Sequence, residues 1–562
     1  MSISYNLIDE PWIPCLFDDG TLRELGLRAV LKEAPRIREI AHDSPLFVAS
    51  IHPILAAILH RVLEQQNDED PEAEWDVWWA QKHFDEAAID AYFEQWHDRF
   101  DLFDVQFPFY QVAGLEMSEA SSLFRLAMEE NNAPAMFANR ANPDWEAPSP
   151  ALAAQLLVTI QNFALGFGRS SKAKIGGEEI EPPYSADGPL LRGLTVWPSG
   201  ETLFQTLCLN VVPHELNPDD APCWELDAPH KLRDLALKSG GRQSTAPRGI
   251  CDLLTLQSRL IRLLPDENEG ETVVAGAYFT QGRSLEKDEA KRPAFHPLNL
   301  YFTSKTAGIV VLSLSEGKAI WRNAHTLFDE NARSQHAQNP LAFVAKMTNA
   351  GAFQPNLNVV GMATEPGKAG KFLLWRYDRL PFSSAFLSDK NVVEILQTAN
   401  DDAGLIADEM RARFASVVRV FIAGDKDGGH KPDPDDVKAL VNKFDPRRDY
   451  WPRLESRFYE LLHALAQNPD DPKAATDRWK SDLQNVARDC LKSACAALGT
   501  SPQAICAVAQ IDLAWPFNLE YLRDPQEFVK AKKLREAQAK TAAKKAAPTS
   551  DSAPQMALNL SA

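Results

Sequence analysis

The spacing of hydrophobic residues divides the chain into a mixed region and a purely helical region. Up to about residue 387, helical spacing alternates with short β-branched runs, whereas later segments show only helical spacing. Three series repeat at i, i+3, i+4 and i+7 or close to it: Phe414, Val417, Val418 and Phe421; Leu454, Phe458, Leu461, Leu462 and Leu465; Trp479, Leu483, Val486 and Cys490. The fold class predicted is therefore α+β, with a large mixed α/β N-terminal domain over residues 1–387 and an all-α C-terminal four-helix bundle over residues 388–523.

Within the mixed region the pattern predicts individual elements. Residues 151–165 form a helix, residues 202–212, 272–279 and 309–314 are strand-like, and residues 248–264 fit a strand or a short helix. Residues 359–375 fit a β-hairpin with an exposed glycine-rich tip. Trp75, Trp78 and Trp79 predict an amphipathic helix with an aromatic inner face.

Two segments lack regular spacing. Residues 112–150 contain many Asn, Pro and Ser residues, and loops of this length in a compact domain are usually functional or disordered. Residues 524–562 form a basic tail rich in Ala and Lys, which we expect to be partly disordered. Between Lys530 and Lys545 this tail holds seven cations and one Glu.

The formal net charge of -19 is concentrated in one segment. From Asp68 to Asp104 there are 13 carboxylates against two cations, so the acidity does not exclude a nucleic-acid-binding face elsewhere. Seven widely spaced cysteines without a CxxC motif argue against disulfides and a zinc site. With no secretory pattern at Met1 and only short apolar runs, we expect a cytoplasmic protein without membrane spans.

Residues 166–177 are the segment richest in candidate binding chemistry. The segment holds four glycines, three cations and two serines, and it follows an apolar run. Its spacing fits neither a P-loop nor a dinucleotide fingerprint. A turn after a helix is one interpretation, but the density of cations favours contact with a nucleic-acid backbone.

No local motif indicates an enzyme. The histidines are scattered, and the paired aspartates at 18–19 and 435–436 lack the spacing of a two-metal site. We therefore expect no catalytic residue, no metal and no cofactor. A soluble hydrolase with a site assembled from distant His, Asp and Ser residues is the alternative.

Several motifs together resemble one family. Residues 6–14 (NLIDEPWIP), residues 107–111 (FPFYQ), and residues 165–168 (LGFG) with Lys172 and Gly176-Gly177 resemble the CasA family, the large subunit of the type I-E CRISPR Cascade complex. The resemblance covers about residues 3–520, and the N-terminal motif is its most specific part.

The resemblance implies a non-enzymatic subunit of an RNA-guided antiviral surveillance complex. Such subunits bind other Cascade subunits and the 5′ handle of the guide RNA. They recognise the protospacer-adjacent motif of double-stranded DNA, help to open the duplex and recruit the helicase-nuclease effector. Base pairing then reads the long sequence while the protein reads the short motif. A purely structural assembly subunit is the other alternative.

Site residues follow from the resemblance alone. It places RNA contacts in an L1 loop (about residues 112–150) and DNA contacts in the glycine loop (residues 166–177), at a cationic finger and in the hairpin. For RNA binding these residues are Phe137, Ala138 and Asn139. For DNA binding they are Gly168, Arg169, Ser170, Ser171 and Lys172, then Arg283 with Lys287 as the alternative finger, and Glu365, Gly367 and Lys368. The tip sequence Glu365-Pro366-Gly367-Lys368 and the side chains at 169–171 depart from some relatives, which suggests a different motif preference.

Overall fold

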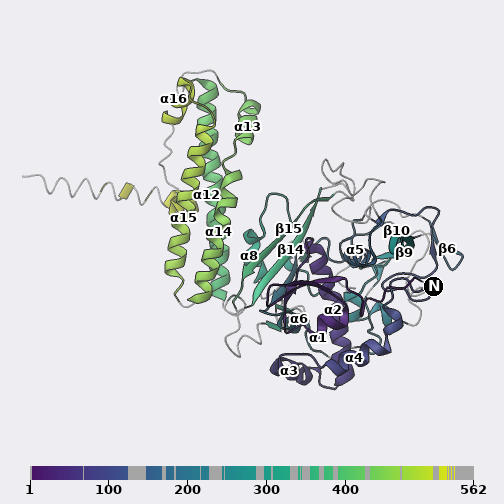
Figure 1. Ribbon diagram of the computed structural model, residues 1–562. Coiled ribbons are helices and arrows are strands. Elements are labelled where there is room, and N and C mark those ends of the chain that lie inside the picture. Colours follow the sequence, from purple (N-terminus) through teal and green to yellow (C-terminus); the bar gives the residue numbers. More distant parts are fainter. Residues whose placement is uncertain are drawn as a thin grey trace, which may run out of the picture. The chain divides into compact units, whose positions relative to one another are not determined.

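The protein is described by a computed structural model with two compact units, Met1–Glu394 and Ile395–Ala562 (Figure 1). The division falls at Glu394, within helix α12, whereas the sequence predicts it at residue 387. The structure describes residues 3–67, 69–123, 147–166, 172–180, 182, 185–214, 217–226, 244–245, 247–285, 296–304, 308–328, 340–341, 343–344, 355–365, 372–383, 386, 390–424, 431–468, 471–510, 518–527, 530, 533–534 and 537.

The first unit is built around helix α2 (Pro45–Gln66), which is buried along most of its length. Helices α4 (Glu86–Gln95), α5 (Pro150–Phe163), α6 (Leu203–Asn210) and α7 (Ile250–Leu254) pack against it. Helix α2 is long and apolar enough to cross a membrane by length and composition, but 89% of its most apolar window is buried inside the protein. Its hydrophobicity is therefore that of a core helix.

The N-terminal motif forms part of this core. A three-stranded antiparallel sheet has the order β2-β1-β3, from β1 (Ile13–Phe17), β2 (Leu22–Leu25) and β3 (Ile37–Ile40), and helix α1 (Leu27–Lys32) follows β2. Trp12 is fully buried, and its indole Nε1 donates a hydrogen bond to the carbonyl of Leu7 at 3.0 Å. The Asn6 side chain accepts from the amide of Ile8 at 3.0 Å and so fixes the turn that leads into β1.

The predicted tryptophan helix is confirmed as α3 (Pro71–Gln81). Trp75 and Trp78 are 2% and 1% exposed, and the Trp75 ring stacks on Trp79 with centroids 5.3 Å apart. Asp70 caps the helix by accepting from the amide of Ala73. The carboxylates lie on the outer face, which explains how an acidic segment can also contribute side chains to the hydrophobic core.

Smaller sheets complete the unit. Strand β14 (Asn356–Thr364) pairs antiparallel with β15 (Phe372–Pro381) and with β7 (Thr195–Ser199), so the predicted hairpin is confirmed (Figure 1). Strands β9 (Arg259–Asn268) and β10 (Glu271–Gln281) form a long antiparallel pair. The other pairings join β4 (Leu115–Glu116), β5 (Ala173–Ile175) and β6 (Glu178–Ile180); β8 (Ser244–Thr245) and β11 (Ser284–Leu285); and β12 (Tyr301–Ser304) and β13 (Gly308–Val311).

Short helical segments link these sheets. They are the 3-10 turns His97–Arg99, Cys223–Glu225 and Ile320–Asn323, and helix α8 (Ala324–Leu327).

The prediction of a strand at residues 202–212 is wrong, because this segment forms helix α6. Thr202 caps the helix by accepting from the amide of Gln205 at 3.3 Å, and the Gln205 side chain accepts from the amide of Glu201 at 2.7 Å. This reciprocal arrangement resembles a capping box, which the Thr-x-x-Gln spacing encodes. Residues 248–264 realise both alternatives in succession, since α7 precedes β9.

The second unit confirms a helical C-terminal region. Its long helices are α12 (Lys390–Ala423), α14 (Arg447–Gln467) and α15 (Lys473–Ala496), which run alongside one another in Figure 1. Trp479 of α15 donates to the carbonyl of Ala399, Tyr450 of α14 donates to the carbonyl of Ala403, and the Phe458 and Trp479 rings meet edge to face at 5.6 Å. All three helices therefore share one core.

Shorter helices extend this unit: α13 (Pro434–Lys443), α16 (Pro502–Gln510) and α17 (Leu519–Arg523). Asp433 caps α13 ahead of Pro434 by accepting from the amide of Asp435, whereas α15 begins one residue after Pro472. Most of the basic tail, including its last 15 residues, lies outside the described residues.

Candidate nucleic-acid interface

The base of the glycine loop is rigidly built. Helix α5 is capped by Ser149, whose hydroxyl accepts from the amide of Leu152, and it ends at Phe163. The backbone then reaches Gly166, whose amide donates to Asp187 Oδ1 at 2.9 Å. A Cβ on Gly166 would lie 2.9 Å from the carbonyl oxygen of Ser185, so only glycine fits at this position.

The far end of the glycine loop is a β-turn. Lys172 is exposed and leads into β5, and β5 pairs with β6 across Gly176-Gly177. Both glycines have positive φ, 58° and 85°, which is the pattern of a two-residue type I′ turn. The β5–β6 hairpin therefore accounts for these two glycines. The remaining predicted DNA contacts of the loop are Gly168, Arg169, Ser170, Ser171 and Lys172. Of these, Gly168, Arg169, Ser170 and Ser171 lie outside the described residues.

Arg259 fastens the loop base to strand β10. Its Nη1 donates to the carbonyl of Ser258 at 2.9 Å and to Gln281 Oε1 at 3.0 Å. Its Nη2 donates to the carbonyls of Leu165 and Ala186 at 2.9 and 2.8 Å. Gln281 Oε1 also accepts from the amide of Ala186 at 2.7 Å. The loop base and the end of β10 therefore share one hydrogen-bond network.

Arg259, whose guanidinium lies at the centre of this network, is 2% exposed. Burial lowers the pKa of Arg259 to about 10, and the charge of Asp187 offsets part of this effect. Arg259 therefore remains a cation near neutral pH, stabilised by four backbone or amide oxygens.

Arg283 lies two residues after the end of β10 and is held in an ion pair. Its Nη1 and Nη2 donate to the two carboxylate oxygens of Asp252 at 2.7 and 2.8 Å, and its amide donates to the carbonyl of Gln257 at 2.9 Å. The side chains of Arg283 and Asp252 are 12% and 2% exposed. For the Arg283 guanidinium to enter a DNA groove, this pair would have to open.

Asp252 is the buried centre of this cluster. It also accepts from the Arg248 guanidinium and from the Arg248 amide, both at 3.0 Å. Burial raises the pKa of Asp252, but the hydrogen bonds and charge of Arg283, with those of Arg248, outweigh burial and lower it to about 2. Asp252 is therefore ionised at neutral pH and orients two arginines.

Both described ends of the L1 loop meet strand β10. Near the start of the predicted loop, Ser121 exchanges two backbone hydrogen bonds with Ala277, at 2.9 and 2.8 Å. Near its end, the carbonyl of Pro148 accepts from the amide of Val274 at 2.9 Å. Phe137, Ala138 and Asn139 themselves lie outside the described residues.

The hairpin residues are described only at the base. Thr364 ends β14, where the register with β15 shifts, and Glu365 follows it. Gly367, Lys368 and the alternative finger Lys287 lie outside the described residues. The described structure thus links the glycine loop, the Arg283 segment and the L1 ends through β10.

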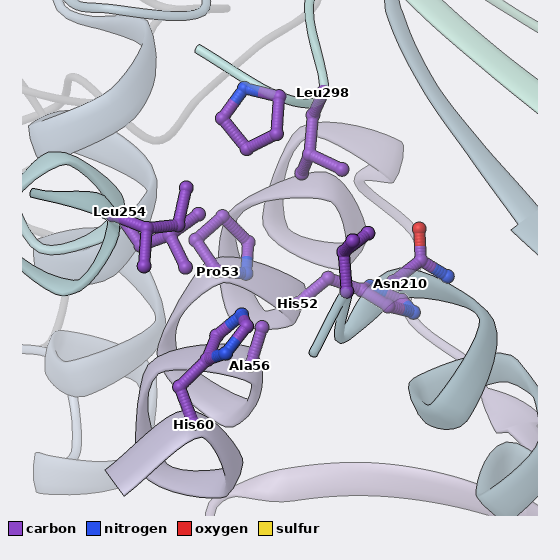
Figure 2. Close-up of a pocket in the computed structure, with 10 residues that line it drawn as sticks. His52, Pro53, Ala56, His60, Asn210, Leu254 and Leu298 are labelled. Carbon is purple, nitrogen blue, oxygen red and sulfur yellow. The ribbon is translucent and has the colours of Figure 1, made fainter. Parts of the chain in front are cut away.

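A small cavity beside α2 is lined by two of the scattered histidines (Figure 2). Its volume is about 10 Å³, which is room for about one water molecule. His52 and His60 line it together with Asn210, whose Oδ1 has no hydrogen-bond partner among the described residues. Burial lowers the pKa of His52 to about 4 and that of His60 well below its usual range, so both rings are neutral at pH 7.

This cavity does not have the composition of a hydrolase site. The residues that line it include no Ser, Cys, Asp or Glu, so neither histidine has a nucleophile to activate there. No group of three or more His, Cys, Asp or Glu side chains among the described residues could hold a metal ion. This cavity therefore gives the hydrolase alternative no support.

Sequence reasoning missed Arg259, Asp252 and Asp187. The signal for Arg259 was present, because the triplet Gln257-Ser258-Arg259 interrupts an otherwise apolar stretch at the start of a buried strand. A polar triplet at such a place requires internal hydrogen-bond partners. No comparable pattern surrounds Asp187.

These features define a class: a mixed α/β unit that gathers several loop bases around one long strand, followed by a helical unit. Residues 6–490 match the family described as CRISPR-associated protein Cse1, so the chain belongs to this family. The resemblance to the CasA family is thereby confirmed.

Individual relatives agree along nearly the whole chain. The CRISPR-associated protein CasA/Cse1 of Thermus thermophilus is 29% identical over 517 residues, which are 90% of this chain and 95% of the relative. The crystal structure of CRISPR-associated protein Cse1 from Acidimicrobium ferrooxidans has a TM-score of 0.73 at 26% identity, covering 93% of this chain and 99% of that one.

A chain from a structure described as a CRISPR RNA-guided surveillance complex has the same fold. Its TM-score is 0.66 at 20% identity, and the match covers 90% of this chain and 98% of that one.

Proposed function

We propose that this protein is the large, non-enzymatic subunit of an RNA-guided CRISPR surveillance complex. In this role it binds the other subunits and the guide RNA 5′ handle in the cytoplasm. It recognises the protospacer-adjacent motif of double-stranded DNA, helps to open the duplex and recruits the helicase-nuclease. Membership of the Cse1 family over residues 6–490 is the observation that carries this proposal.

The arrangement of the first unit supports a role in recognising duplex DNA. The glycine loop and the Arg283 segment are distant in sequence, yet Arg259 and Gln281 join their bases within hydrogen-bond distance. A short motif is best read by several elements held in fixed register, because each base pair offers few contacts in the minor groove.

A binding experiment with the assembled, guide-loaded complex tests the DNA role. Lys368→Ala removes a cation predicted to contact DNA, so we expect about 5-fold weaker binding of a motif-bearing duplex and a salt slope smaller by about 1. Arg23→Ala is the matched control, since Arg23 is a half-exposed cation of the N-terminal sheet that pairs with Glu33.

Three glycine-loop and finger variants extend this test. Arg169→Ala, Lys172→Ala and Arg283→Gln are each expected to weaken binding of the same duplex. Unchanged binding in all four variants, with complex assembly intact, would contradict the DNA role and favour a purely structural assembly subunit. A library of duplexes randomised at the motif then gives the motif preference.

A further inference from the structure

The amide of Gly166 donates to one carboxylate oxygen of Asp187, and the other oxygen of this carboxylate also accepts a hydrogen bond. Asp187 Oδ2 accepts from Arg192 Nε at 2.6 Å, while Oδ1 accepts from Gly166 at 2.9 Å. The carboxylate thus joins the start of the glycine loop to an arginine five residues further along the chain.

Arg192 continues the connection to the hairpin. Its Nη1 donates to the hydroxyl of Thr364 at 2.8 Å, and its backbone carbonyl accepts from Ser313 Oγ at 2.7 Å. Thr364 is the last residue of β14 that pairs with β15, opposite Phe372. The hydrogen bond from Arg192 therefore holds β14 at the residue after which the hairpin tip begins.

We propose that Arg192 is a positioning residue that couples the glycine loop to the hairpin, so that the two elements meet DNA in a fixed relative geometry. The inference rests on the proposed function, because it assigns these elements to the same DNA motif. The chain of contacts runs from Gly166 through Asp187 and Arg192 to Thr364, and it spans segments almost 200 residues apart in sequence.

Arginine suits this role through the geometry of its guanidinium more than through its charge. The Arg192 and Asp187 side chains are 53% and 26% exposed, and an ion pair this exposed adds little stability by itself. The planar guanidinium, however, directs two N–H groups to two acceptors in a rigid fork. A lysine ammonium keeps the charge but lacks that fork, so geometry and charge can be separated by mutation.

The test uses two matched pairs of variants in the full chain and its guide-loaded complex. Thr364→Val removes the hydroxyl at constant shape, and Thr364→Ser restores a hydroxyl. Arg192→Lys keeps the charge, and Arg192→Gln keeps one planar donor group without it. Site-resolved hydrogen exchange of the Gly166 amide and binding of motif-bearing and motif-lacking duplexes are the readouts.

We expect Thr364→Val and Arg192→Lys each to speed exchange of the Gly166 amide and to lower the ratio of motif-bearing to motif-lacking affinity by about 5-fold. Arg192→Gln should behave like Arg192→Lys, and Thr364→Ser should behave like the parent. The salt slope should stay unchanged, because no phosphate contact is removed.

Two results would overturn the coupling. One is an unchanged exchange rate at Gly166 in Thr364→Val and Arg192→Lys. The other is faster exchange with an unchanged affinity ratio, which would make the contacts merely structural. Lys368→Ala in the same assay separates the two proposals: if it weakens binding while the coupling variants do not, only the coupling fails. If the affinity ratio is close to one in the parent complex, the proposed function itself fails.

Discussion

Arg283→Met tests how the Asp252 carboxylate is stabilised. The substitution keeps an unbranched side chain but removes the two hydrogen bonds at 2.7 and 2.8 Å that neutralise this buried group. Breaking a buried ion pair costs about 3–5 kcal/mol. Arg248 still donates to Asp252 at 3.0 Å, so we expect the lower end of that range, about 3 kcal/mol at pH 7.

The pKa of Asp252 supports this magnitude and adds a pH dependence. A shift from 3.8 in the unfolded chain to about 2 in the folded protein corresponds to about 2 kcal/mol of stability at pH 7. Because the folded pKa is the lower one, this contribution is complete above about pH 4 and is lost as the pH falls towards 2. In Arg283→Met the pKa of Asp252 should rise, so this acid-dependent loss should shrink.

Urea denaturation of the isolated chain at pH 7, followed by melts across the acid range, measures both effects. The double variant Asp252→Asn/Arg283→Met leaves no buried charge unpaired and should be more stable than Arg283→Met alone. Arg23→Met is the control, because its exposed pair should cost less than about 1 kcal/mol. Parent-like stability of Arg283→Met, or a double variant no more stable than the single one, would refute the reasoning.

Three further predictions concern the loop base, a buried histidine and the helical unit. Gly166→Ala places a Cβ 2.9 Å from a backbone carbonyl, so it should cost about 1–3 kcal/mol in thermal unfolding, and a parent-like melt would contradict this fit. His52 has a folded pKa of about 4 against 6.5 unfolded, so parent stability should fall as the pH drops from about 6.5 to 4, and His52→Gln should show a flatter profile. Trp479→Ala should cost about 3–5 kcal/mol, measured by urea denaturation, because it removes a 2%-exposed indole and its bond to Ala399; a loss below about 1 kcal/mol would argue against the shared helical core.

Much of the fold follows from periodicity, because long amphipathic helices bury their apolar stripe wherever they pack. The series at Leu454 and Trp479 lie on α14 and α15, and Trp75 lies on α3. The segment at residues 202–212 is easily mistaken for a strand because its apolar residues are buried on all sides, which removes the helical period. Its Thr202-x-x-Gln205 cap is the better signal.

The candidate site was harder to predict, because it is built from long-range polar contacts. Arg283 could be singled out by resemblance, but its buried partner Asp252 lies 31 residues earlier, with nothing in the local sequence to pair them. The contact between Arg192 and Thr364 joins residues 172 positions apart. Such pairs depend on the tertiary fold, which sequence spacing does not encode.

The length of strand β10 sets a distance between two of the predicted contact regions. This strand carries the ends of the L1 loop at Val274 and Ala277, and it ends at Gln281, two residues before Arg283. An extended strand rises about 3.3 Å per residue, so Ala277, where Ser121 attaches, and Gln281 at the end of β10 lie only about 13 Å apart. If the L1 loop binds the guide RNA as predicted, β10 sets the distance between the RNA handle and the DNA motif. One inserted residue between Ala277 and Gln281 would lengthen that distance by one residue and turn Gln281 to the opposite face.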